Sequence, residues 1–214
     1  MSSAHGEQVR VFEEQGHEEG GRSLNWWGMI FFIASEALIF ANLIAVFLYL
    51  YIRDGANWQL PEAEILGSHL PAAAFPAGLN TIILLSSSIF MHMAGSAIRK
   101  GNQRKMIIGL IGTIVLGLIF LGGQVYEYVD FYGQNFTMTL GTKGSAFYTI
   151  TGFHGIHVSI GALFLIICLI RGIRGDFTAK NHFAVEAAEM YWHFVDGVWI
   201  FVFSVVYLLP LLRG

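Results

Sequence analysis

Two histidines stand where their spacing could support metal chemistry. His154 and His157 lie three residues apart in TGFHGIHVSIG, and this spacing places two imidazoles on one helix face, where they could bind one metal ion. No carboxylate stands at the neighbouring turns of that helix, and a pair hydrogen-bonded to another helix needs no metal. We therefore predict a structural pair and keep metal binding as the alternative.

A single carboxylate, Glu36, interrupts the apolar run 26–51, with Ser35 beside it. Its distance from Trp27 is about 13 Å along a helix, which places it near mid-membrane. A charge at the bilayer centre costs roughly 3 kcal/mol, so it needs a partner or a function. Two interpretations stay open: a group that handles protons or contacts lipid, and a neutral acid hydrogen-bonded to a neighbouring helix.

Two further sets of polar residues lie in or beside apolar runs. Gln124 and Glu127 share a helix face through their i to i+3 spacing, which favours an interhelical hydrogen bond over catalysis. Four others recur every three or four positions and form one polar stripe that must face protein: Glu186, Glu189, His193 and Asp196. The stripe predicts a helix interface.

The chain lacks the ligands for a redox centre of its own. Of its 8 histidines, His5 and His17 lie in the polar N-terminal tail, and His69 and His182 fall in predicted loops, so too few remain for a haem–copper core. Cys168 is the one cysteine, whereas a two-copper site normally needs a pair, and the paired Glu-x-x-His motifs of di-iron bundles do not occur. We predict no catalytic residue, no metal ligand and no cofactor in this chain.

Composition places these residues in a membrane. Hydrophobic residues make up 55% of the chain and charged residues 13%, which argues against a soluble globule. The net charge of −3 suggests no nucleic-acid partner. We predict an all-α integral membrane bundle of five transmembrane helices, from apolar runs long enough to cross a ~30 Å hydrocarbon core: 26–51, 79–98, 106–126, 146–170 and 191–212.

The connections between these runs predict their orientation. Residues 52–78 hold Pro61, Pro71 and Pro76, so we expect a surface loop there and no further membrane helix. The chain then divides into a polar tail, 1–25, and the bundle, 26–214. We expect a cytoplasmic N-terminus and a periplasmic C-terminus, because basic residues gather in the second and fourth connections: Arg99, Lys100, Arg104, Lys105, Arg171, Arg174 and Lys180.

Several segments together resemble the cytochrome c oxidase subunit III family and its quinol-oxidase counterparts. They occur in family order and cover every predicted helix: FFIASEALIF, LNTIILLSSS, QVYEY, TGFHGIHVSIG and HFAVEAAEMYWHFVDGVWIFVF. The chain is similar to the bacterial five-helix form, since it starts at what is the third helix of seven-helix members. Its end, VVYLLPLLRG, departs from the aromatic-rich terminus of the family.

The resemblance implies a non-redox accessory subunit of a proton-pumping haem–copper terminal oxidase, with haem and copper held by partner subunits. It implies a main contact with subunit I, further contacts with subunit II and a small subunit IV, and bound phospholipid, in a bacterial inner (plasma) membrane; a respiratory supercomplex stays open. Glu36 and Ser35 would be the proton- or lipid-related residues. The structural polar network would comprise Asn80, Gln124, Glu127, His154, His157, Glu186, Glu189, His193, Asp196 and Trp199.

Three other functions stay open from sequence alone. The same motifs would suit a subunit III-like component of a nitric oxide reductase system. An independent transporter could use Glu36, His154 and Asp196 as a proton relay, but the sequence lacks the broken helix pairs typical of transporters. A stand-alone membrane metalloenzyme is disfavoured by the missing ligand sets. We expect the accessory subunit, in an assembly that oxidises cytochrome c or a quinol and reduces O2.

Overall fold

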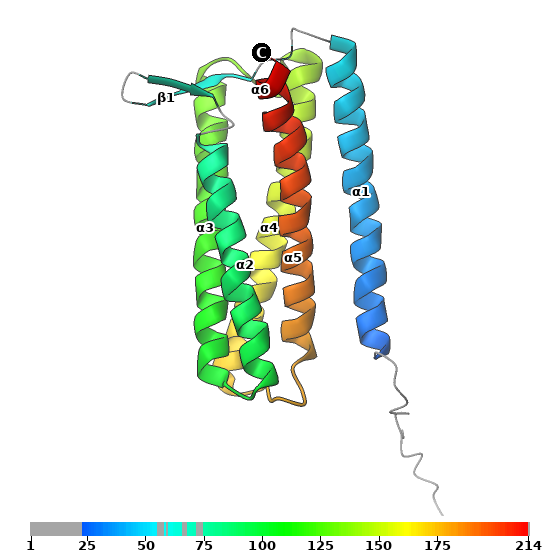
Figure 1. Ribbon diagram of the computed structural model, residues 1–214, viewed down its shortest axis with the longest axis vertical. Coiled ribbons are helices and arrows are strands. Elements are labelled where there is room, and N and C mark those ends of the chain that lie inside the picture. Colours follow the sequence, from blue (N-terminus) through cyan, green and yellow to red (C-terminus); the bar gives the residue numbers. More distant parts are fainter. Residues whose placement is uncertain (1–22, 55–57, 59, 66–67, 72–74, 214) are drawn as a thin grey trace, which may run out of the picture.

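The computed structural model describes residues 23–54, 58, 60–65, 68–71 and 75–213. These residues form five helices long and apolar enough to cross a membrane, and they run side by side (Figure 1), which confirms the predicted bundle. The first 22 residues of the predicted polar tail lie outside this description. The long helices are α1 (Leu24–Asp54), α2 (Ala77–Arg99), α3 (Gln103–Gly133), α4 (Gly141–Arg174) and α5 (Phe183–Phe203).

The last span continues beyond α5 through a π-helical segment. This segment, η2 (Ser204–Leu208), leads into the short helix α6 (Leu209–Arg213). Pro210 has no backbone N–H, and its ring crowds the carbonyl of Val206 four residues earlier. A wider turn at this point accommodates the proline without ending the span.

The helices extend beyond the predicted apolar runs because polar side chains also occupy helical turns. α5 begins at Phe183 rather than near 191, so Glu186 and Glu189 lie in its first two turns. α4 ends at Arg174 and is capped by Gly175, whose φ of 84° is the left-handed conformation that glycine adopts readily. At the start of α3, the Asn102 side chain accepts a hydrogen bond from the Lys105 backbone N–H at 3.0 Å.

Part of the connection between α1 and α2 forms a small antiparallel hairpin instead of an irregular surface loop. Strand β1 (Glu62–Ile65) pairs with β2 (Ser68–Pro71). Strands this short leave little periodicity to detect in a sequence, which explains why the prediction missed them. Trp58 of the same connection is buried, with its ring 5.1 Å from Phe47 and 5.8 Å from Tyr51 of α1.

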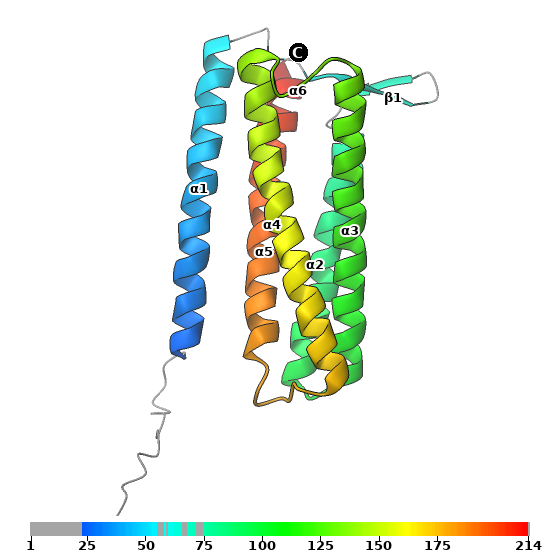
Figure 2. The same cartoon turned by 180° about the vertical axis from the view of Figure 1, so that it is seen from behind.

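α1 stands at the edge of the bundle. It packs on α4 and α5, while α2 and α3 lie on the far side (Figure 2). In its most apolar window 11% of the residues are buried inside the chain, against 39% in each of the other four spans. Most of the α1 surface is therefore left for lipid or for another protein.

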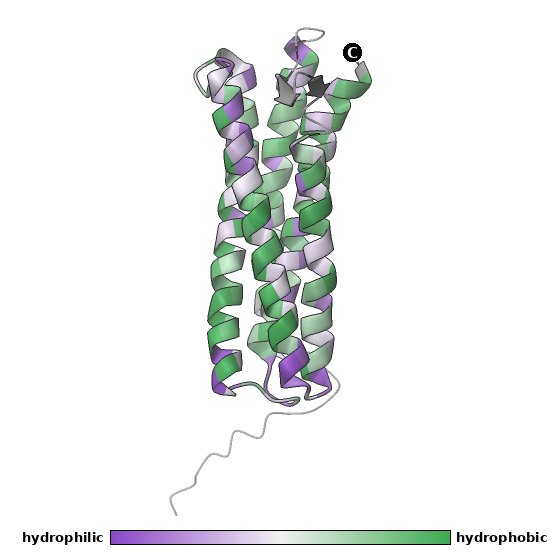
Figure 3. Cartoon of the chain, turned by 90° about the vertical axis from the view of Figure 1, so that its left-hand side faces the viewer, coloured by the Kyte–Doolittle hydropathy of each residue, from purple (hydrophilic) through white to green (hydrophobic). Residues whose placement is uncertain are grey.

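Polar residues gather at the two ends of the bundle, and apolar residues predominate along the helices (Figure 3). The α2–α3 and α4–α5 connections lie at the same end as the start of α1 (Figure 1). The two connections richest in basic residues therefore share one side of the bundle. This arrangement is the one that the predicted orientation requires, and which side is cytoplasmic stays a prediction.

Gly109 allows a close approach of α2 and α3. A Cβ atom at this position would lie 2.7 Å from the Phe90 carbonyl oxygen and 2.8 Å from the Cβ of Ala94. A backbone atom cannot move aside as the tip of a side chain can, so a larger residue must push the helices apart. Small residues at helix crossings are a general feature of membrane bundles.

Replacing Gly109 with alanine is expected to lower the free energy of unfolding by about 1–3 kcal/mol, the usual range for overpacking. Gly122→Ala on the same helix is the matched control, because a Cβ there meets nothing within 4 Å. The measurement is the unfolding free energy of both variants in one detergent or lipid. Equal values for the two variants would contradict the close approach.

Candidate functional site: polar networks between helices

Glu36 meets His157 across the contact between α1 and α4. The Oε2 atom of Glu36 lies 2.9 Å from Nε2 of His157, and Nδ1 of His157 lies 2.7 Å from the carbonyl oxygen of Phe153. A carbonyl can only accept, so Nδ1 carries a hydrogen. The hydrogen between Nε2 and Oε2 then comes either from a protonated carboxyl group or from an imidazolium.

The surroundings of this pair are partly open. The side chains of Glu36 and His157 are 20% and 10% exposed. The Tyr191 hydroxyl donates to the His157 carbonyl at 3.2 Å, and the Phe40 ring lies 4.8 Å from the imidazole. Ser35 takes no part in the Glu36–His157 contact. Its hydroxyl donates to the Phe32 carbonyl at 2.7 Å, and the residue is exposed on α1.

The two histidines of α4 do not converge on one ligand. His154 is fully buried, with its ring 4.7 Å from that of Trp199 and 5.8 Å from that of Phe120. Neither of its ring nitrogens has a hydrogen-bond partner within the described part of the chain. Of the predicted hydrogen-bonded pair, only His157 therefore bonds to another helix, because His154 faces the aromatic interior while His157 faces α1.

A second network joins α3 to the last span. Glu127 is 1% exposed, and its Oε2 atom accepts from Gln124 Nε2 at 2.8 Å and from the Tyr207 hydroxyl at 2.9 Å. The contact between Gln124 and Glu127 lies within α3, and Tyr207 supplies the interhelical bond. The sequence analysis missed Tyr207, although a phenol hydroxyl inside an apolar span needs a partner.

A third set of contacts joins α2 to α5 along most of their length, and we call it the α2–α5 seam. Near one end the Trp199 indole donates to the Thr81 hydroxyl at 2.9 Å. Further along, the Trp192 indole donates to the Ser87 hydroxyl at 2.9 Å. Both tryptophans are fully buried, so each indole N–H needs a partner, and a hydroxyl on the facing helix provides it.

The seam continues with ionisable groups. Ser88 donates to Oδ2 of Asp196, and its hydroxyl oxygen lies 3.1 Å from Nδ1 of His193. Towards the start of α5, Glu189 lies 3.1 Å from Arg99 and 3.4 Å from His92. Three of the four residues of the predicted polar stripe therefore face α2.

Two predicted residues lie apart from the seam contacts: Glu186, the fourth residue of the stripe, and Asn80 of the predicted polar network. Glu186 pairs with His182 at 3.4 Å, four residues earlier in the chain. Asn80 is 5% exposed and lies against α3, where a Cβ added at Gly123 would overlap the Asn80 amide. Asn80 therefore occupies a second close crossing of α2 and α3.

The sequence analysis missed the hydroxyl partners on α2. Thr81 and Ser88 are seven residues apart, or about two helical turns, and so lie on one face. Ser87 is beside them in the run LNTIILLSSS. Serine and threonine can bond to the carbonyls of their own helix, so their presence in an apolar run does not demand an interhelical partner. The seven-residue spacing of Thr81 and Ser88 was the feature of the sequence that could have indicated a polar face towards another helix.

The fold and these networks define a multi-pass membrane protein whose interior polar groups bond mainly to one another. The family model of cytochrome c oxidase subunit III matches residues 14–210. The chain belongs to the cytochrome c oxidase subunit III family, as its motifs predicted.

Relatives from distant organisms support this assignment. The cytochrome c oxidase subunit 3 of Synechocystis sp. is 40% identical over 201 residues, which cover 92% of this chain and 80% of the relative. That of Marchantia polymorpha is 42% identical over 188 residues, covering 85% and 67%. That of Mammuthus primigenius is 38% identical over 210 residues, covering 93% and 75%.

The contact between Glu36 and His157 should appear as a coupling energy in a double-mutant cycle. Glu36→Leu and His157→Leu are expected to couple by about 0.6–1.7 kcal/mol, the average and upper range measured for such bonds in membrane bundles. The measurement is the unfolding free energy of both single variants and the double variant. Glu36→Leu combined with Asn42→Leu is the control, because Asn42 bonds to the Leu38 carbonyl of its own helix. A coupling no larger than that of the control would contradict the contact.

Proposed function

We propose that this chain serves as the non-redox accessory subunit of a haem–copper terminal oxidase in aerobic electron transport, packed mainly against subunit I. The observation that carries the proposal is the family match over residues 14–210, which includes most of every span. Subunit II and a small subunit IV are further proposed neighbours. The exposed surface of α1 supports such packing, since Phe31 is 69% and Ile52 is 68% exposed.

Bound phospholipid is the second part of the proposal. A pocket of about 590 Å³ lies between α1 and α5 and begins one residue after Glu36. Its lining is almost entirely apolar, which suits an acyl chain: Ala37, Phe40, Ala41, Ile44, Ala45, Leu48, Phe194, Gly197, Val198 and Phe201. We assign this pocket to a lipid chain lying along α1.

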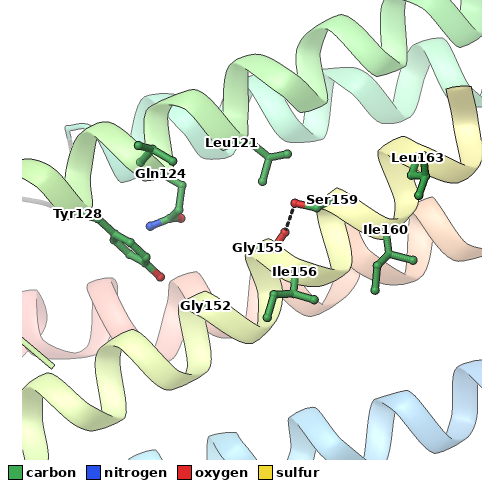
Figure 4. Close-up of a pocket in the computed structure, with 10 residues that line it drawn as sticks. Leu121, Gln124, Tyr128, Gly152, Gly155, Ile156, Ser159, Ile160 and Leu163 are labelled. Atoms are coloured by element: carbon green, nitrogen blue, oxygen red, sulfur yellow. Dashed lines mark hydrogen bonds between the residues drawn. The ribbon is translucent and has the colours of Figure 1, made fainter.

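Two other pockets offer similar surfaces. One of about 420 Å³ lies between α1 and α4. Another of about 500 Å³ lies between α3 and α4, where Leu121 points from α3 towards α4 and Tyr128 lies towards one end (Figure 4). The pocket between α1 and α5 suits the proposal better because Phe40, which lines it, also contacts His157 of the Glu36–His157 pair.

Support of proton uptake is the third part. Carboxyl groups and imidazoles are the side chains that most often donate and accept protons in proteins. Glu36 is 20% exposed, so the pair lies where the chain meets its surroundings rather than deep in its core. We propose that it assists the proton uptake and the durability of the assembly.

The location of the chain is the fourth part of the proposal. The chain is a multi-pass membrane protein by its five spans. We propose the plasma membrane of a bacterium, with the N-terminus in the cytoplasm, because the basic connections share the end of the bundle where α1 begins.

Isolation of the chain in mild detergent, through a tag on its N-terminal tail, tests its place in an oxidase. Haem and a copper-containing oxidase core are expected in the eluate, visible in the optical spectrum and by subunit identification. A nitric oxide reductase core in the eluate would overturn the oxidase assignment. A colourless chain eluting alone, under conditions that keep membrane complexes intact, would favour an independent transporter.

Glu36→Ala is expected to leave haem content and the initial rate of O2 reduction nearly unchanged in the assembled complex. It should at the same time lower lipid retention, proton uptake and the number of turnovers before inactivation, because the Glu36–His157 contact beside the pocket is lost. Asn42→Ala, on the same helix and also polar, is the matched control. Immediate and complete loss of activity in a fully assembled Glu36→Ala complex would contradict a supporting role.

A further inference from the structure

One group of three ligand-bearing side chains lies at the end of the α2–α5 seam nearest the start of α5. His92, Glu189 and His193 each offer a ligand atom, and these atoms lie within 4.8 Å of one another. The distance to Oε1 of Glu189 is 3.4 Å from Nδ1 of His92 and 4.0 Å from Nε2 of His193. In a tetrahedral zinc site with bonds of ~2.0 Å, neighbouring ligand atoms lie about 3.3 Å apart. Small side-chain movements would bring the three atoms to that spacing.

We propose that these three side chains bind a divalent transition-metal ion, with Zn²⁺ as the ion that tests it. Two imidazoles and one carboxylate match the ligand preferences of zinc and copper, whereas magnesium and calcium prefer oxygen ligands throughout. No metal ligand was predicted from the sequence because the chain lacks the ligand sets of known redox centres, and His92 lies on a helix distant in sequence from the polar stripe of α5. Only the folded pairing of α2 with α5 brings the third ligand to the other two.

The hydrogen bonds around His193 prepare it for a metal. The Ser88 hydroxyl donates to Asp196, so its oxygen is left to accept from Nδ1 of His193, which lies 3.1 Å away. Nδ1 then carries the hydrogen of the neutral imidazole, and Nε2, which faces Glu189, has the free lone pair. Metal-bound histidines usually donate their other ring N–H to an oxygen in this way.

The carboxylate of Glu189 is held in place from two sides. Arg99 lies 3.1 Å from Oε2, which leaves Oε1 towards the two imidazoles. On α2, Gly95 makes room for the carboxylate, because a Cβ atom at that position would overlap it. The positive charge of Arg99 opposes a second cation, so we expect binding in the micromolar range rather than the tight binding of a structural zinc site.

An ion can reach the group from the membrane surface. A pocket of about 500 Å³ includes Glu189, His193 and Arg99 in its lining, with Ser23 and Trp26 from the start of α1. The His92 side chain is 70% exposed. Glu189 lies six residues after the start of α5, or about 9 Å along the helix, so the path is short. A bound ion would link α2 to α5 beside the first turn of α1.

Zinc binding by the full chain, isolated with the subunits that accompany it, tests the proposal. The tag contains no histidine, and His5 and His17 of the tail are replaced with asparagine in every sample, so that neither contributes ligands. Metal per chain is measured after equilibration with micromolar free Zn²⁺, and X-ray absorption at the zinc edge identifies the ligands. We expect bound Zn²⁺ with two imidazoles and one carboxylate oxygen among its ligands, and a much lower zinc content in His193→Gln.

Single replacements and one control make the result specific. His92→Gln, Glu189→Gln and His193→Gln should each weaken zinc binding by roughly 10-fold or more, as ligand loss does. His182→Gln is the control, because His182 pairs with Glu186 at 3.4 Å but belongs to no group of three ligands in the described residues. Zinc content that is unchanged in all three ligand variants, or a spectrum without imidazole, would overturn the proposal.

A fourth variant keeps every ligand and tests the geometry. Gly95→Ala should displace the Glu189 carboxylate and lower zinc affinity, while haem content and co-purified subunits show that the complex is assembled. Parent-like affinity in Gly95→Ala would contradict the geometry proposed here. Co-purification and zinc content are separate readouts, so failure of this proposal is distinguishable from failure of the oxidase assignment.

Discussion

Polar groups in hydrocarbon have no water to bond with, and the arrangement of this bundle follows from that constraint. Each helix carries apolar residues on most of its surface, and these residues do not distinguish one neighbour from another in lipid. The polar side chains do distinguish between neighbouring helices, because each needs a hydrogen-bond partner at a particular position. Trp192 donates to Ser87, Trp199 donates to Thr81, and Asp196 accepts from Ser88. A shift of α5 along α2 by one turn would therefore break all three hydrogen bonds together. The α2–α5 seam therefore fixes the register of the two helices.

The same constraint separates what the sequence could predict from what it could not. Apolar runs predict membrane helices because length and hydropathy are local properties, and Glu36 stood out because a carboxylate in such a run is costly. The partner of Glu36 is not local. His157 lies 121 positions away in the chain, and its spacing from His154 predicted a structural pair, with a shared metal as the alternative, but did not identify Glu36 as the partner.

The hydroxyl partners of the buried carboxyl groups could not be predicted from the sequence either. Ser88 and Tyr207 hold Asp196 and Glu127 in the folded chain, yet neither residue is unusual in an apolar run. The polar stripe of α5 predicted an interface, but only packing decides that Glu189 faces α2 while Glu186 pairs with His182. The hairpin between α1 and α2 was missed for a different reason, since strands of four residues carry too short a pattern.

α1 is fastened to the rest of the chain at separated points. Glu36 bonds to His157 of α4, and Asp54, about 27 Å further along the helix, accepts from the Thr142 hydroxyl at 2.7 Å. Between these points the pockets against α4 and α5 leave it without protein neighbours on part of its surface. Lipid chains in those pockets, as proposed above, would complete its packing, so the position of this helix would depend on the composition of the surrounding membrane as well as on the amino-acid sequence.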